Sequence, residues 1–197
     1  MAAFVSRWIR RASEMHAGAG RMAPMATHQI RVFGDPVLKR AAEPVTDVDG
    51  AFTKLVDAMY DTMYEAPGVG LAAPQVGVQR RFFVYDVGDG PHVLLNPEIV
   101  EATGEWTYEE GCLSLPGLAF EIVRPRLITV RAEDLDGNEV VVQGDELLGR
   151  VFLHEIDHLD GVLMLDRLER DERKRAMREL REQGMGVPTP GGRRHAL

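Results

Sequence analysis

Two histidines and a glutamate in one short segment have the spacing of a metal-binding helix. The segment reads His154-Glu155-Ile156-Asp157-His158, an HExxH motif. Residues four apart lie about one turn apart on the same helical face, so both imidazoles can reach one metal ion. Glu155 lies about 100° around the helix from His154, so its carboxylate can reach water at the metal without being a ligand. The alternative is a helix whose histidines are ordinary surface or core residues.

The positions around this motif predict a buried helix with an apolar wall. Leu147 and Val151 fall on the same stripe as His154 and His158, and apolar residues also occupy the other side. A helix that is apolar nearly all round is buried, and buried imidazoles need partners, which a metal ion provides. Leu147 and Val151 suit contact with an apolar substrate side chain, although plain core packing also explains them.

A catalytic metal site of this kind needs a third protein ligand. The only cysteine in the chain, Cys112, stands in Glu110-Gly111-Cys112-Leu113-Ser114, upstream of the histidines. The glutamates downstream of the motif lie among arginines. A buried structural thiol and a Cys–His nucleophilic pair are alternatives, but the HExxH motif favours a thiolate ligand.

The composition is that of one ordinary globular domain. The 197 residues are 45% hydrophobic and 27% charged, with a formal net charge of −8, and they suffice for one core. A single cysteine excludes an internal disulfide, and no apolar run approaches the roughly 18 residues that cross a bilayer. The acidic balance argues against broad nucleic-acid binding. We therefore expect neither a membrane partner nor specific DNA binding.

The two ends of the chain differ in composition from the rest. Residues 1–27 carry four arginines and one acid, and the remainder has 19 basic and 30 acidic residues, a net charge of −11. We expect residues 1–27 to be a disordered extension, 28–183 a single catalytic domain and 184–197 a flexible tail. The alternatives for the first segment are an organelle transit peptide and sequence upstream of a true start at Met22 or Met25.

Hydrophobic periodicity and turn residues predict an α+β domain. Helices are expected over 49–65, 145–159 (with Asp145 as its cap) and 169–183. Strands are expected over 81–87, 92–96, 122–133 and 139–143, with a hairpin around 136–138 and a glycine-broken loop over 68–77. The expected architecture is mixed or antiparallel strands packed around a central metal-binding HExxH helix, with a C-terminal helix.

Three motifs together resemble peptide deformylase. They are Gly68-Val69-Gly70-Leu71-Ala72-Ala73-Pro74-Gln75, Glu110-Gly111-Cys112-Leu113-Ser114 and His154-Glu155-Ile156-Asp157-His158. The similarity covers about residues 30–181, and the motifs stand in the family's order. It implies removal of the formyl group from the N-terminal formyl-methionine of new polypeptides. It also implies one divalent metal held by Cys112, His154 and His158, natively Fe²⁺, with Zn²⁺, Ni²⁺ or Co²⁺ able to occupy the site.

The resemblance also implies roles for other residues. Water activated by the metal attacks the formyl carbon with Glu155 as general base and then acid, and the Gln75 amide and the Leu113 backbone N–H stabilise the oxyanion. The implied substrate-binding residues are Val69, Gly70, Glu110, Leu147 and Val151, where Gly70 lets the backbone approach the substrate. Arg124 and Asp157 match family positions, and we expect them to form a buried or half-buried pair that orients the metal helix.

Two positions depart from the family pattern. Leu153 stands where glutamine is more frequent, and Arg150 stands where an apolar pocket residue is frequent. Both bear on the shape of the pocket rather than on the reaction.

Several expectations concern partners and rival functions. The mixed charges of the last helix predict an exposed, salt-bridged surface, and the resemblance suggests that this helix contacts the ribosome. We expect a cytoplasmic protein, or an organellar one if residues 1–27 are a transit peptide. A metalloprotease with the same motif and a catalytically inactive metal-binding or ribosome-associated protein are the rival functions.

Overall fold

The computed structural model describes residues 27–185, and the expectations for residues 1–26 and 186–197 lie outside this part. The helical elements are η1 (Pro36–Lys39), α2 (Gly50–Glu65), η2 (Ala73–Val76), α3 (Glu146–Leu159), η3 (Met164–Arg167) and α4 (Arg170–Glu182). The strands are β1 (Gly70–Ala72), β2 (Phe82–Tyr85), β3 (His92–Thr103), β4 (Trp106–Gly111), β5 (Ala119–Arg124), β6 (Leu127–Glu133) and β7 (Glu139–Asp145). The fold is α+β with antiparallel strands, as expected from the sequence.

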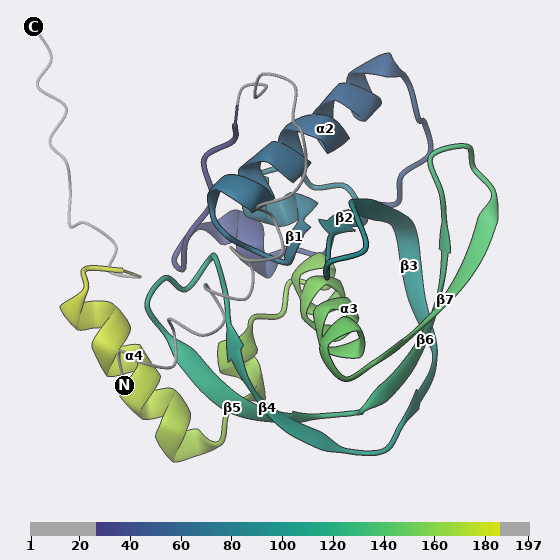
Figure 1. Ribbon diagram of the computed structural model, residues 1–197. Coiled ribbons are helices and arrows are strands. Elements are labelled where there is room, and N and C mark those ends of the chain that lie inside the picture. The colour runs from purple at the N-terminus through teal and green to yellow at the C-terminus, as the bar shows by residue number, and fades with distance from the viewer. Residues whose placement is uncertain (1–26, 186–197) are drawn as a thin grey trace, which may run out of the picture.

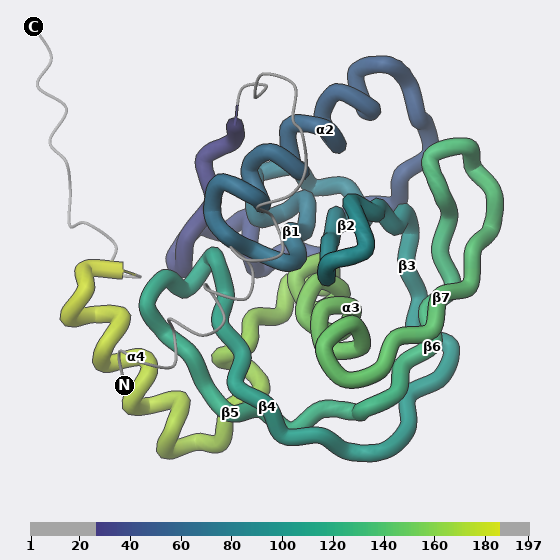
Figure 2. Tube along the Cα trace, viewed as in Figure 1, coloured from purple at the N-terminus to yellow at the C-terminus, as the bar shows by residue number. Residues whose placement is uncertain are grey.

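The strands form two separate sheets. The larger has the order β1-β2-β3-β6-β7, while β4 and β5 pair only with each other. We call this pair the β4–β5 ribbon. Figure 1 shows the larger sheet curving around α3, with α2 on the opposite side and α4 beside β5, and Figure 2 follows the same path as a tube. None of the helices in residues 27–185 combines the length and apolar composition needed to cross a membrane.

Strand β2 explains how one sheet supports helices on both faces. Side chains alternate along a strand, and here Phe82 and Val84 pack with the buried face of α2, whereas Phe83 and Tyr85 pack with Phe152 of α3. All four strand residues are buried. A strand covered on both sides reads as a continuous apolar run, which is why the sequence indicates it clearly.

The three predicted helices are all present, and the difference from prediction concerns one capping hydrogen bond. Asp49 begins α2, and its carboxylate accepts a hydrogen bond of 2.8 Å from the Phe52 N–H. Asp145 is the N-cap residue of α3, as predicted, but its side chain makes no capping hydrogen bond. The α3 helix is buried along nearly its whole length, as its all-round apolar pattern predicts.

Several strand boundaries differ from those expected. The predicted run 122–133 is two strands, because Pro125 lacks the N–H that a continuous ladder requires. The segment 68–77 is not only a loop, since it contains β1 and η2, both too short to show periodicity. Strand β3 continues to Thr103, and β4 was not expected from the sequence.

Candidate active site

Cys112, His154 and His158 come together where α3 faces the end of β4. One potential ligand atom from each lies within 4.8 Å of the others, and Cys112 Sγ is 3.2 Å from His158 Nε2. The cysteine directly follows β4, and the histidines lie one turn apart on α3. Their rings are 5.0 Å apart between centroids and nearly perpendicular. Three residues from two motifs that lie far apart in the sequence therefore form one cluster.

The cluster fits a divalent metal ion. His154 Nδ1 lies 3.1 Å from Glu110 Oε2, which leaves Nε2 for a metal and fixes the ring, as second partners of metal-bound histidines do. Burial lowers the pKa of His158 well below its usual value, favouring the neutral imidazole that binds metals. One thiolate and two imidazoles suit zinc, iron, cobalt or nickel.

Glu110 is a buried carboxylate with cations on several sides. Arg124 donates to both of its oxygens, at 2.5 and 2.9 Å, and Arg150 donates to Oε1 at 2.7 Å. Burial acts to raise the pKa of Glu110, but the hydrogen bonds from His154 and Arg124 outweigh it and hold the pKa well below its usual range. Glu110 therefore stays charged and reinforces the orientation of His154.

The pair of Arg124 and Asp157 is present as expected. Arg124 Nη1 donates to Asp157 Oδ2 at 2.8 Å, and both side chains are buried. Arg167 of η3 also donates to Asp157, at 2.5 and 3.1 Å. A chain of charges thus runs from the surface at Arg167 to the imidazole of His154.

Glu155 occupies a different environment from Glu110. It is 4% exposed, and burial raises its pKa to about 7. Its Oε2 has no hydrogen-bond partner among the described residues. A carboxylate with a pKa near neutrality can both accept and return a proton, which suits general acid–base catalysis.

The structure explains why a glycine is required at position 70, which the sequence did not reveal. A Cβ placed on it would lie 2.5 Å from Glu155 Oε1 and 3.0 Å from Glu155 Cδ. The glycine therefore makes room for the Glu155 carboxylate. The resemblance predicts that the Gly70 backbone approaches the substrate, and the close approach in the structure is to Glu155.

Gln75 is buried and held at both ends of its amide. Its Oε1 accepts a hydrogen bond of 2.8 Å from the Ala72 N–H, and its Nε2 lies 3.2 Å from Ser114 Oγ and 3.9 Å from Cys112 Sγ. The N–H groups of the amide are therefore directed toward the metal cluster, where they can stabilise negative charge.

A cavity of about 230 Å³ opens beside these residues. The expected site residues that line it are Val69, Gly70, Gln75, Glu110, Cys112, Leu113, Val151, His154 and Glu155. Leu147 is half-buried and is not among the lining residues. Much of the remaining wall comes from Gly68, which belongs to the first motif, and from 66–67 and 116–119, which the sequence did not indicate because small and turn residues carry no periodic signal.

Arg150 lies in a buried, charged environment that the sequence did not predict. The sequence marks it as a departure at an apolar pocket position, and the structure shows it buried, lining the cavity and hydrogen-bonded to Glu110. The available signal was its position one turn before His154 in a helix that is otherwise apolar. A buried arginine requires a buried acidic partner.

The fold and site define an α+β enzyme with a cavity beside a buried HExxH helix. Comparison with known protein families and sequences identifies the family of this enzyme. The sequence profile of the family described as Polypeptide deformylase matches residues 27–174. The peptide deformylase of Agathobacter rectalis is 52% identical over 145 residues, covering 74% of this chain and 92% of that protein. The chain therefore belongs to the polypeptide deformylase family.

Solved structures agree with this assignment. The crystal structure of peptide deformylase from Thermotoga maritima is 48% identical with a TM-score of 0.72, and the match covers 74% of this chain and 99% of that one. The structure from Legionella pneumophila is 43% identical with a TM-score of 0.77, covering 81% and 96%. The family's reaction is removal of the N-formyl group from new polypeptides.

Replacing Gly70 with alanine tests the packing against Glu155. The added methyl must displace the carboxylate, and a displacement of about 1 Å at a reacting group costs on the order of 10²-fold in rate. We expect kcat for a formyl-Met peptide to fall by about that factor while metal content stays unchanged. Gly50→Ala is the control, because its Cβ meets nothing within 4 Å. A Gly70→Ala enzyme with the kcat of the Gly50→Ala control would refute this role.

Proposed function

We propose that the chain removes the formyl group from N-terminal formyl-methionine by metal-assisted hydrolysis. The observation that carries the proposal is the meeting of Cys112, His154 and His158 at a cavity that Glu155 also lines. These three side chains would hold one divalent ion. Fe²⁺ is the proposed native ion, with Zn²⁺, Ni²⁺ and Co²⁺ as substitutes.

Each step of the reaction has a residue suited to it. A divalent ion supplies a Lewis acid that makes a water molecule nucleophilic near neutral pH. Glu155 takes the proton from that water and later returns it to the leaving amine, since its pKa of about 7 permits both transfers. The Gln75 amide and the Leu113 backbone N–H donate to the oxyanion that develops from the formyl oxygen.

The methionine side chain is proposed to enter the cavity against apolar residues. Val69 and Val151 line the cavity and are buried, and contact with thioether and methylene groups there excludes water. The contribution of Leu147 stays a prediction, because this residue lies outside the lining. Glu110 lines the cavity and is proposed both to contact the substrate and to orient His154. The pair of Arg124 and Asp157 is proposed to orient the ligands without touching the substrate.

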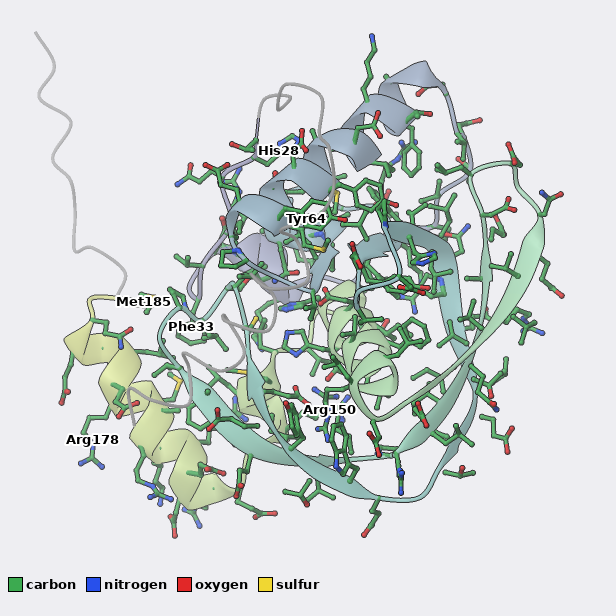
Figure 3. The ribbon with its side chains drawn as sticks, in the orientation of Figure 1. His28, Phe33, Tyr64, Arg150, Arg178 and Met185 are labelled. Atoms are coloured by element: carbon green, nitrogen blue, oxygen red, sulfur yellow. The ribbon has the colours of Figure 1, made fainter. Side chains whose placement is uncertain are left out.

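The α4 helix is proposed to contact the ribosome. Its buried face is apolar, with Ala176 and Leu180 in the core, whereas Arg175 and Arg178 are exposed. Figure 3 shows Arg178 projecting away from the body of the protein. Cations on an exposed helix suit the phosphates of RNA. Action on nascent chains would place the protein in the cytoplasm, or in an organelle if residues 1–27 are a transit peptide.

A metalloprotease and a catalytically inactive metal-binding protein are the rival functions. A protease would cut internal peptide bonds and would tolerate loss of the thiol. An inactive protein would have no use for a buried general base or a fixed amide, and both Glu155 and Gln75 are buried beside the cluster.

Activity and metal content of three proteins distinguish these functions. We expect hydrolysis of a formyl-Met peptide by the wild type, loss of metal and activity in Cys112→Ala, and a loss of about 10²-fold to 10⁴-fold in kcat for Glu155→Ala with metal retained. Formate release and metal analysis provide the measurements. Activity that survives removal of the thiol would contradict the proposed site.

Reversing one charge on α4 tests the ribosome contact. Arg178→Glu is expected to weaken co-sedimentation with ribosomes and to reduce its salt dependence by about one phosphate contact, with activity on a free peptide unchanged. Lys54→Glu makes the same charge change at an exposed position of α2 and is the control. Equal co-sedimentation of the two variants would remove Arg178 from the contact.

A further inference from the structure

Arg150 connects α3 to both strands of the β4–β5 ribbon. It is 2% exposed, and its Nη2 donates to the Trp106 carbonyl oxygen of β4 at 2.6 Å. Its Nη1 donates to the Ile122 carbonyl oxygen of β5 at 2.8 Å and to Glu110 Oε1 at 2.7 Å. The guanidinium also lies over the Trp106 ring, 5.1 Å from the centroid. Figure 3 shows Arg150 below α3, next to this ribbon.

The attachment of the ribbon decides where Cys112 lies relative to the histidines. The ribbon is hydrogen-bonded as a sheet to no other described strand, and it is joined to the larger sheet at one end, where Thr103 of β3 pairs with Leu127 of β6. Cys112 directly follows β4, whereas His154 and His158 belong to α3. The distance between the sulfur and the imidazoles therefore depends on contacts that cross from the ribbon to the helix.

Beyond the strands themselves, the Glu146 N–H at the start of α3 donates to the Arg126 carbonyl oxygen, two residues after β5, at 3.1 Å. The apolar side chains around Cys112, including Leu115 and Ile122, cluster with residues of η3 and α4. Arg124 of β5 reaches Asp157 of α3, but only through two side chains that each have rotatable bonds. Arg150 instead binds main-chain oxygens of both strands, so a single planar group sets the position of the backbone.

We propose that Arg150 is a positioning residue that holds the ribbon, and hence Cys112, at the distance from α3 that binding one metal ion requires. The same group holds Glu110 Oε1, while Glu110 Oε2 faces His154 Nδ1. The arginine thus acts on a thiolate and an imidazole together. The inference rests on the proposed function, since it assumes that the three ligands share one ion.

Cobalt binding measures this positioning without relying on activity. Wild type, Arg150→Met, Arg150→Lys and Arg126→Met would be loaded with Co²⁺ and titrated with a chelator of known affinity. Absorption bands report the thiolate–cobalt bond and the ligand geometry. Arg126→Met is the matched control, because it removes an exposed arginine bound to Glu146 of the same helix.

We expect Arg150→Met to weaken Co²⁺ binding by about 10-fold to 100-fold, with altered cobalt bands. Arg150→Lys is expected to fall between this variant and the wild type, because one ammonium cannot span both carbonyls and Glu110 in the planar geometry of a guanidinium. Arg126→Met is expected to match the wild type in affinity and spectrum.

The possible outcomes separate this inference from the proposed function. A wild type without a thiolate–cobalt band contradicts the proposed metal site itself. A normal wild type with an equally tight Arg150→Met variant overturns only the role of Arg150. If circular dichroism finds both Arg150 variants unfolded in saturating Co²⁺, Arg150 is a folding residue, and the positioning role is also overturned.

Discussion

The structure depends on one constraint, which is that α3 carries charged and polar side chains into a buried position. The buried polar residues of α3 are Arg150, Glu155, Asp157 and His158, each at most 7% exposed. Buried charges are costly unless they are paired and hydrogen-bonded. Most of the partners come from the β4–β5 ribbon, so the polar groups of the helix and the ribbon specify one another's positions. The cavity lies where these two elements meet.

The same constraint gives two neighbouring carboxylates opposite properties. Glu110 faces guanidinium groups and an imidazole, which hold its pKa low and keep it charged. Glu155 lies against Gly70 and is desolvated without a guanidinium partner among the described residues, so its pKa rises to about 7. One carboxylate is therefore suited to orientation and the other to proton transfer.

The features that could be predicted from the sequence are those that depend on local periodicity and spacing. The buried helix, the face shared by His154 and His158, and the α+β class follow from local patterns, and all are present. The burial of Arg150 and the packing of Gly70 against Glu155 did not follow, because each depends on a contact between residues 40 or more positions apart. Strand β4 was missed because its glutamates conceal the alternation expected of a strand.

X-ray absorption spectroscopy of the zinc-loaded enzyme tests the central claim most directly, since it reports the ligand atoms around the ion. Cys112, His154 and His158 predict one sulfur at about 2.3 Å and two imidazole nitrogens at about 2.0–2.1 Å. The Cys112→Ala variant should fail to retain zinc, whereas Glu155→Ala, which is expected to retain the metal, should keep the sulfur shell. A shell of nitrogen and oxygen alone in the wild type would contradict the account.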